Sequence, residues 1–405
     1  MISIEEQIRI ISKGAQEIIN TGELEQKLRS SQKTGRPLTV KLGLDPTAPD
    51  IHLGHTVVLR KIRQFQDLGH KAVIIIGDFT GMIGDPTGRS NTRRQLMRDE
   101  VIDNAKTYEA QMYKILDRER TQLRFNSEWL GKLDFAKVLV LASKYTVARM
   151  LEREDFHNRF KANEPIGIHE FFYPLMQGYD SIEINADVEL GGTEQRFNIL
   201  MGRKLQKDFG QQSQVALFMP ILEGIDGTEK MSKSLGNYIG INEDAANMYG
   251  KIMSIPDDLI IKYFELVTDV HPDEIAAMEK ALRSDEVNPR DLKMRLAREI
   301  VGLYHGAESS RCAEESFISV FRRKGIPDDI MEVRLDGELL SGTVTDMAEI
   351  LVKLGFCTSK SEARRLITQG AVRINGDKLS SFTIPALNNG DVIQAGKLKF
   401  ARILL

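Results

Sequence analysis

Two histidines stand three residues apart in the segment His52-Leu53-Gly54-His55. At the start of a helix, such a pair lies on one face, beside free backbone N–H groups and a helix dipole that both favour anions. Gly54 has no Cβ, so a base or a phosphate can approach the helix backbone closely. The segment therefore favours a nucleotide site, while two histidines satisfied near a helix cap are the alternative. Zinc is disfavoured, because no third His or Cys accompanies the pair.

A second candidate motif, Lys230-Met231-Ser232-Lys233-Ser234, follows the apolar run 215–222 in a polar loop. Two lysines separated by serine can fold over a triphosphate, to which they supply point charges and hydroxyl donors. Taken alone, the loop could also be a solvated basic turn. Together with the histidine segment, it predicts chemistry on a nucleoside triphosphate.

The chain around the histidines predicts a βαβ unit. We expect a short strand over 38–43, a helix over 51–68 that Gly69 closes, and a buried strand in AVIIIGD. Continuous apolar strands are typical of a parallel sheet that is covered on both faces. Ligands of such sheets bind beyond the carboxyl ends of the strands, where GLDPTAPD and GDFTGMIGDPTGRS would lie.

Three domains are expected in this α/β chain. Residues 1–245 would form a Rossmann-like parallel-sheet catalytic domain, with a helical insertion at about 129–162 and the lysine loop at 230–234. An α-helical domain would cover 246–325, and a linker 326–343. The segment 344–405 would be a small, separate α+β domain. It has nine Lys or Arg against five Asp or Glu, which favours contact with a polyanion.

Composition excludes several classes of protein. The 405 residues are 41% hydrophobic and 28% charged, which excludes a chain that is disordered throughout. A net charge of −3 argues against a protein whose whole surface is basic and binds nucleic acid without specificity. Cys312 and Cys357 stand apart without a CxxC, so neither a disulfide framework nor a cysteine zinc site is expected. No segment resembles a signal peptide or reaches the roughly 18 apolar residues of a membrane span. We expect a soluble protein of the cytoplasm.

The two motifs, in this order, are the signatures of class I aminoacyl-tRNA synthetases, which the chain resembles. Within that class, YPLMQGYDS and GGTEQRFN are similar to the tyrosyl-tRNA synthetase pattern. The segment GDFTGMIGDPTG resembles a second bacterial subgroup of that family. The resemblance covers essentially the whole chain, including a tail that is similar to the RNA-binding module of the ribosomal small-subunit protein S-four type.

The resemblance implies a tyrosine–tRNA ligase activity. Such an enzyme joins L-tyrosine to ATP as tyrosyl-adenylate with release of pyrophosphate, and then transfers the tyrosyl group to the 3′ end of tRNA(Tyr). The protein would contribute positioning and charge stabilisation, because the substrate carboxylate is itself a nucleophile. Mg²⁺ would enter with ATP, held by phosphate oxygens and water, without a protein metal site or a permanently bound cofactor. A homodimer with its interface at about 129–162 is also implied.

The residues that the resemblance assigns to catalysis are His52, His55, Lys230 and Lys233. Those on the ATP side are Asp45, Thr47, His52, Gly54, His55, Gly191, Gly192, Glu194, Met231, Ser232 and Lys233. Those around the tyrosine are Asp85, Tyr173 and Gln177 at its ammonium, Asp180 at its hydroxyl and Gln195 at its carboxylate. Pyrophosphate would be reached by Arg89 and Arg93. The RNA backbone would contact the basic residues of the tail, namely Lys360, Arg364, Arg365, Arg373 and Lys378.

Two positions depart from the family pattern. Lys41 stands where many tyrosyl enzymes carry a Tyr that helps to bind the substrate hydroxyl, and Glu194 stands where they often carry Asp. Beside Asp180, the Lys41 ammonium would either neutralise the hydroxyl acceptor or orient it. Asp78 is a further candidate acceptor near the phenol.

Two competing functions are weighed against this one. A tryptophanyl-tRNA synthetase shares the fold and the class motifs, but an indole does not need the carboxylate of Asp180. A non-catalytic RNA-binding relative would keep the fold, but both motifs are intact in this chain.

Overall fold

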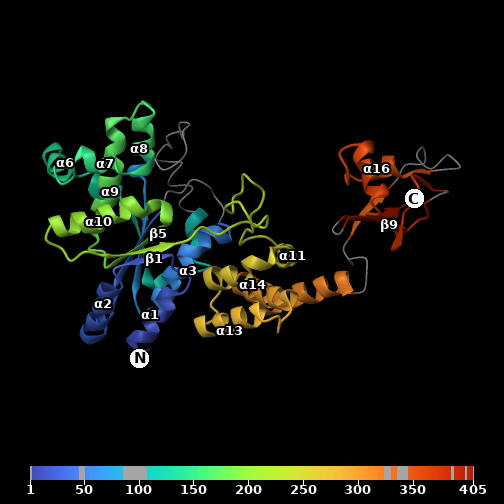
Figure 1. The fold of residues 1–405 in the computed structure, drawn as a ribbon, viewed down its shortest axis with the longest axis horizontal. Coiled ribbons are helices and arrows are strands. Elements are labelled where there is room, and N and C mark those ends of the chain that lie inside the picture. Colours follow the sequence, from blue (N-terminus) through green and yellow to red (C-terminus); the bar gives the residue numbers. More distant parts are fainter. Residues whose placement is uncertain are drawn as a thin grey trace. The chain divides into compact units, whose positions relative to one another are not determined.

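The computed structural model describes residues 2–44, 51–84, 107–322, 330–334, 345–384, 387–396 and 399–404. The chain divides into two compact units, Met1–Ser310 and Arg311–Leu405 (Figure 1). Residues 246–310 thus belong to the same unit as the sheet, and the domain boundary expected after residue 245 stays a prediction. No helix in the described ranges is long and apolar enough to cross a membrane.

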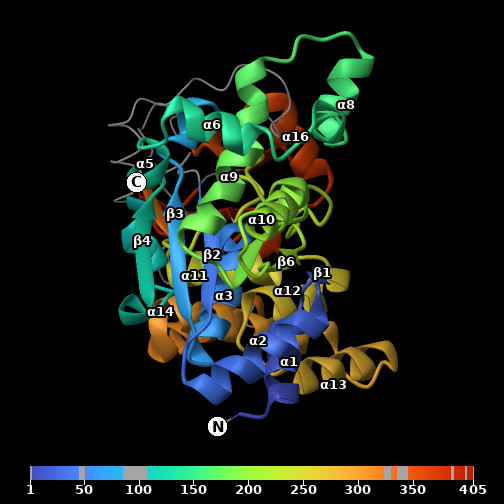
Figure 2. The ribbon, with the colours of Figure 1, turned by 90° about the vertical axis from the view of Figure 1, so that its left-hand side faces the viewer.

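The first unit is built on a six-stranded sheet in the order β1-β6-β5-β2-β3-β4. All neighbouring strands run parallel except β1 and β6, which confirms the predicted parallel sheet. Figure 2 shows β4, β3 and β2 side by side. The bounds are β1 (Glu17–Ile19), β2 (Thr39–Leu44), β3 (Lys71–Ile76), β4 (Thr121–Phe125), β5 (Val188–Gly192) and β6 (Val215–Met219).

Helices cover both faces of this sheet, as its near-continuous apolar strands require. In Figure 1, α9 (Phe172–Glu183) and α10 (Arg196–Asp208) lie on one side and α1 (Ile4–Ser12) and α3 (Leu53–Asp67) on the other. The remaining helix before β2 is α2 (Thr21–Thr34). Strand order reverses between β5 and β2, so their carboxyl ends define the crevice where ligands of α/β sheets bind.

Buried cations hold α3 in place. The Lys61 ammonium donates to the carbonyl oxygens of Ile11, in the last turn of α1, and of Lys13, just after α1, at 2.9 and 2.7 Å. Arg60 pairs with Asp269, which follows α12 (Ile260–Val267). Because buried charges are costly without partners, these contacts fix α3 and hence the histidine segment at its start.

Between β4 and β5 lie α5 (Ser127–Leu130), α6 (Phe135–Ala142), α7 (Val147–Met150) and α8 (Glu154–Lys161), in the region of the expected insertion. After β6, the unit continues with α11 (Ala245–Met253), α12, α13 (Pro272–Arg283) and the part of α14 (Pro289–Arg322) up to Ser310. Gly306 interrupts α14 with a φ of 85°, a left-handed conformation that glycine adopts without steric cost.

The second unit is a small α+β fold with its own core. Two helices, α15 (Met347–Lys353) and α16 (Lys360–Thr368), accompany a five-stranded sheet in the order β10-β9-β12-β13-β7. Its strands are β7 (Met331–Arg334), β9 (Val372–Ile374), β10 (Asp377–Lys378), β12 (Val392–Ala395) and β13 (Lys399–Leu404), and β8 (Thr345–Asp346) pairs with β11 (Thr383–Ile384). Side chains such as Met347, Leu351 and Ile393 are fully buried in one cluster.

Candidate active site

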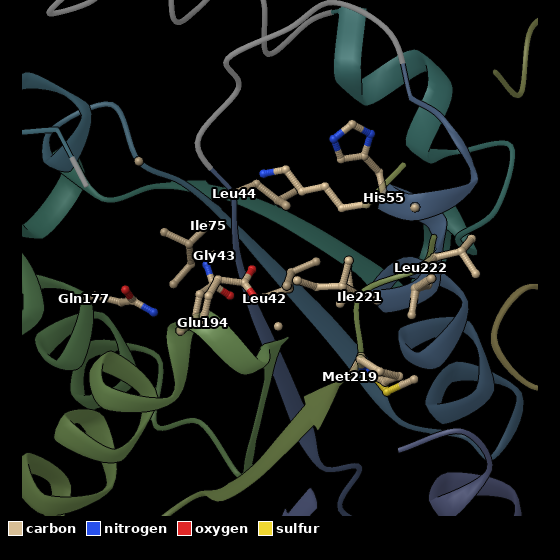
Figure 3. A pocket seen from close by; sticks show the side chains of 18 of the residues that line it. Leu42, Gly43, Leu44, His55, Ile75, Gln177, Glu194, Met219, Ile221 and Leu222 are labelled. Atoms are coloured by element: carbon tan, nitrogen blue, oxygen red, sulfur yellow. The ribbon is translucent and has the colours of Figure 1, made fainter. Parts of the chain in front are cut away.

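A cavity of about 580 Å³ opens at the carboxyl ends of β2, β3, β5 and β6 in the first unit. It is the position that the sheet topology predicts for a ligand. The cavity brings together twelve of the predicted site residues, namely His52, Gly54, His55, Tyr173, Gln177, Asp180, Gly192, Glu194, Gln195, Lys230, Met231 and Ser232. In the view of Figure 3, Gln177 and His55 lie on opposite sides of it, with Glu194 between them.

The histidine side of the cavity is the start of α3. His52 is the residue before the first turn, and its ring stacks on that of His55 at a centroid distance of 3.8 Å. The His55 Nδ1 accepts a hydrogen bond from the His52 backbone N–H at 3.3 Å, whereas the buried His52 Nδ1 has no hydrogen-bond partner among the described residues. Such an atom, on the wall of a cavity, is suited to a ligand.

Both histidines are neutral at pH 7. Burial, together with the nearby Lys233 ammonium, lowers the pKa of His52 to about 3 and that of His55 to about 4, and His55 contributes to the lowered pKa of His52. A neutral imidazole offers one donor and one acceptor, so the pair can hydrogen-bond to a phosphate chain but adds no positive charge. The positive charge of this side therefore comes from the lysine loop.

The lysine loop lies against the start of α3. The Met231 Sδ accepts a hydrogen bond from the Gly54 N–H at 3.3 Å, and a Cβ on Gly54 would meet the His52 ring at 3.0 Å. The sequence prediction that a glycine is needed here for close approach is therefore consistent with the contacts. Lys230 is exposed, and the Lys233 ammonium lies 5.9 Å from the centroid of the Tyr238 ring.

Asn237 braces the lysine loop from within. Its Oδ1 accepts from the Ser232 N–H at 2.8 Å, and its Nδ2 donates to Asp226 at 2.6 Å and to the Lys230 carbonyl at 3.1 Å. The sequence analysis missed this residue, although it follows the motif at a distance of only three residues. Its amide therefore holds the backbone of the loop on both sides of Met231.

The glycine segment that follows β5 makes room for two side chains. A Cβ on Gly192 would lie 2.3 Å from the Glu194 carboxylate, and one on Gly191 would lie 2.5 Å from the Gln195 amide oxygen. Gly192, Glu194 and Gln195 line the cavity, whereas Gly191 does not. The glycines therefore let these side chains fold back over the end of the strand.

The far side of the cavity is formed by α9, which carries Tyr173, Gln177 and Asp180 on one face. The Asp180 carboxylate is buried and accepts from the Trp129 Nε1 at 2.8 Å and the Asn126 Nδ2 at 3.5 Å. Burial raises its pKa to about 7, against the effect of Lys41 and of the two donors. A buried carboxyl group with spare acceptor capacity on a cavity wall is suited to a hydroxyl donor.

Gln177 is held by a neighbouring helix. Its Oε1 accepts from the Asn198 Nδ2, on α10, at 2.8 Å, and the Asn198 Oδ1 accepts from the Arg153 Nη1 at 3.3 Å. Asn198 and Arg153 are both buried. Neither they nor Asn126 and Trp129 were predicted as site residues. Trp129 is the single tryptophan of the chain, which is the signal that could have singled it out.

Lys41 acts on Asp180 through its charge, as expected, but its direct partner is another carboxylate. Its ammonium pairs with Glu189 at 2.9 Å, because parallel pairing of β2 and β5 sets the two residues in register. The Asp78 carboxylate accepts from the Ser127 N–H at 2.9 Å and from the Ser127 hydroxyl at 2.6 Å, at the start of α5. Neither residue lines the cavity. A contact of Lys41 or Asp78 with a substrate hydroxyl stays a prediction.

Several predicted residues lie outside the described ranges. They are Asp45, Thr47, Asp85, Arg89 and Arg93. The five basic residues of the tail lie in the second unit, where Lys360, Arg364 and Arg365 are exposed on α16. Arg373 and Lys378 are register partners in β9 and β10. The Lys360 ammonium pairs with Glu349 at 2.8 Å.

Comparison with known proteins identifies the class. The family model described as "tRNA synthetases class I (W and Y)" matches residues 32–322, and the model "S4 domain" matches residues 348–381. The chain therefore belongs to the class I tRNA synthetases, which confirms the resemblance of the two motifs. A solved tyrosyl-tRNA synthetase from Archaeoglobus fulgidus shares the fold, with a TM-score of 0.60 at 23% identity over 77% of this chain and 100% of that chain.

Curated relatives narrow the class to one branch. The chain is 61% identical to a protein named tyrosine–tRNA ligase 2 from Clostridium acetobutylicum, over 100% of both chains. It is 58% identical to a tyrosine–tRNA ligase from Moorella thermoacetica, over 98% of this chain and 95% of that protein. Within the class, the chain thus groups with the tyrosine–tRNA ligases, as YPLMQGYDS and GGTEQRFN predict.

Proposed function

We propose that this chain is a tyrosine–tRNA ligase, which activates L-tyrosine with ATP and then charges tRNA(Tyr). The observation that carries the proposal is the cavity that joins the histidine segment, the lysine loop and the buried Asp180. One end thus offers donors for a phosphate chain, and the other offers an acceptor for a phenol hydroxyl. Full-length identity of 61% to a tyrosine–tRNA ligase supports it.

In the first step, the tyrosine carboxylate attacks the α-phosphorus of ATP, and the bond to pyrophosphate breaks. Asp180 accepts from the phenol hydroxyl, Tyr173 and Gln177 lie at the substrate ammonium, and Gln195 positions the carboxylate. Negative charge builds on the phosphate chain, where His52 and His55 donate hydrogen bonds and Lys230 and Lys233 supply positive charge. Glu194 and the adjoining glycines face the ribose. In the second step, a terminal ribose hydroxyl of tRNA attacks the carbonyl carbon of the adenylate, the bond to the phosphate oxygen breaks, and AMP leaves as the tyrosyl ester forms.

ATP is proposed to enter as its Mg²⁺ complex. Among the described residues, no group of three or more His, Cys, Asp or Glu could hold a metal ion. We expect phosphate oxygens and water to coordinate the ion, which is the usual manner of Mg²⁺ binding at nucleotides. The tail, which matches the S4 model, and the helical segment 246–325 are proposed to contact tRNA. The cytoplasm is the proposed location, since tRNA charging requires a pool of tRNA and ATP.

The activity is tested by ATP–pyrophosphate exchange on the full chain with Mg²⁺ and tyrosine, tryptophan or phenylalanine. We expect exchange with tyrosine alone, because a site built around a hydroxyl acceptor leaves that acceptor unpaired when the hydroxyl is absent. Exchange driven by tryptophan would assign the chain to the tryptophanyl branch. No exchange with any of the three would favour a non-catalytic RNA-binding protein.

We further propose that the chain is a homodimer through its insertion between β4 and β5. This segment exposes an unusual number of large apolar side chains, namely Phe135, Leu139, Val140, Val147, Phe160 and Ile168, which are 51–78% exposed. Contiguous exposed apolar side chains mark protein interfaces. Coverage by the same surface of a second copy would form a closed, two-fold symmetric contact.

The double variant Phe135→Glu/Val147→Glu is expected to be monomeric. Sedimentation velocity at micromolar concentration should give twice 45.7 kDa for the unchanged chain and 45.7 kDa for the variant. Phe382→Glu, at an apolar residue of the second unit that is 44% exposed, is the matched control and should remain dimeric. An unchanged chain that sediments as a monomer would refute the proposed dimer.

A further inference from the structure

A buried ion pair lies beneath the amino-acid end of the cavity. Lys41 on β2 and Glu189 on β5 are register partners, so their side chains project side by side from the sheet toward α9. The Lys41 Nζ lies 2.9 Å from the Glu189 Oε1, and the two side chains are 0% and 1% exposed. Two charges so deeply buried are costly unless further hydrogen bonds satisfy them.

Both members of the pair are hydrogen-bonded to α9. The Lys41 ammonium donates to the Gln177 carbonyl and to the Ser181 hydroxyl, each at 2.8 Å. The Glu189 carboxylate accepts from the Ser181 hydroxyl at 3.1 Å and from the Gln177 Nε2 at 3.4 Å, and also from Gln214. All three ammonium protons are thus used, and the contacts hold the helical turn that contains Asp180.

The pair acts on the cavity from outside it. Neither Lys41 nor Glu189 lines the cavity, whereas Gln177 and Asp180 do. The steps proposed above for activation use neither charge. The two buried charges contact the helical turn that carries Gln177 and Asp180. They are therefore suited to hold that turn in place and to alter the electrostatic potential at Asp180.

We propose that Lys41 and Glu189 are a positioning pair for the amino-acid pocket, which fixes the turn carrying Gln177 and Asp180 and tunes how strongly Asp180 accepts a phenol hydrogen bond. The pair is thereby a determinant of the preference for tyrosine over phenylalanine. This inference rests on the proposed function of Asp180 as the hydroxyl acceptor.

The two charges act on Asp180 in opposite directions. Lys41, from β2, lowers the pKa of the Asp180 carboxyl group, and Glu189, from β5, raises it. The neighbours on the α5 side, Trp129 and Asn126, are neutral donors, and Asp78 after β3 is bonded to Ser127. Removal of the Lys41 charge should therefore raise the pKa of Asp180, and removal of the Glu189 charge should lower it.

The experiment compares Lys41→Met, Glu189→Gln and the double variant by kcat/KM for tyrosine and for phenylalanine in ATP–pyrophosphate exchange. Each single variant should lower the tyrosine-to-phenylalanine ratio by about tenfold or more, because either loss releases the turn that carries Gln177 and Asp180 and so misplaces the hydrogen bond to the substrate hydroxyl. The acidic limb of the tyrosine kcat/KM profile should move to higher pH in Lys41→Met and to lower pH in Glu189→Gln.

The double variant separates positioning from stability. A neutral pair leaves no unpaired buried charge, so its melting temperature should recover relative to the single variants. Its tyrosine-to-phenylalanine ratio should stay at least about tenfold low, because the ammonium donors to Gln177 and Ser181 are missing. If Lys41→Met does not fold, this variant carries the test.

Lys27→Met is the matched control, since Lys27 is a buried lysine that pairs with Asp187 at 3.3 Å outside the cavity. It should lower the melting temperature and leave the ratio unchanged. A wild-type ratio in the double variant, or in stable single variants, would overturn the inference. Absence of tyrosine-dependent exchange in the unchanged chain would instead overturn the proposed function.

Discussion

Lys233→Ala should slow tyrosine activation by about 10²–10³-fold, the cost typical of removing one preorganised group from a developing charge. The expected effect is on kcat, since the ammonium meets the most charge as pyrophosphate departs. The lysine is well placed for this role: its charge lowers the pKa of His52 and of His55 at the start of α3. Single-turnover formation of tyrosyl-adenylate measures the effect directly.

A control for this prediction lies beside the same aromatic ring. The Lys251 ammonium is 4.9 Å from the Tyr238 ring centroid, but it is bound to Glu243 at 2.7 Å and to the Tyr238 carbonyl at 3.0 Å. Lys251→Ala should change the adenylate rate by less than about threefold. Equal losses in the two variants would mean that Lys233 acts through the fold of the loop and not through its charge.

Asp180→Asn should reduce the preference for tyrosine over phenylalanine by about 10- to 100-fold, because a hydrogen bond to a charged group is worth about 1.5–3 kcal/mol. The kcat/KM for tyrosine should fall, whereas that for phenylalanine should stay unchanged, because phenylalanine has no hydroxyl group to bind Asp180. The ratio of the two kcat/KM values in ATP–pyrophosphate exchange is the measurement. Glu183→Gln, at an exposed carboxylate of the same helix, should leave the ratio unchanged.

Stability against pH supplies an independent check on Asp180. Burial raises its pKa from 3.8 to about 7 in the folded chain, so the folded state binds its proton more tightly than the unfolded state. Its stabilising contribution is therefore complete below about pH 4 and is lost as the pH rises through 7. The free energy of unfolding of the unchanged chain, minus that of Asp180→Asn, should fall over this range. A constant difference would show that the group is not buried as described.

The sequence determined much of the fold and one side of the site. Apolar strands with a helix between them predicted the parallel sheet, because such strands are stable only when both faces are covered. His52, Gly54, His55 and the lysine loop were predicted as neighbours although about 175 residues separate them along the chain. In the structure the Gly54 N–H donates to the Met231 Sδ and residues of both segments line one cavity, because the sheet brings the carboxyl ends of β2 and β6 to the same edge.

Only the tertiary structure decided the amino-acid side. Lys41 acts on Asp180 through its charge, as expected, but strand register made Glu189 its direct partner, which no local pattern had singled out. Trp129 and Asn126 reach Asp180 from a segment more than fifty positions earlier, and Asn198 reaches Gln177 from the next helix. A sequence motif predicts which chemical groups a strand or helix carries. The partner of a buried charge depends instead on strand register and on packing between segments that are distant in the chain, which no local pattern contains.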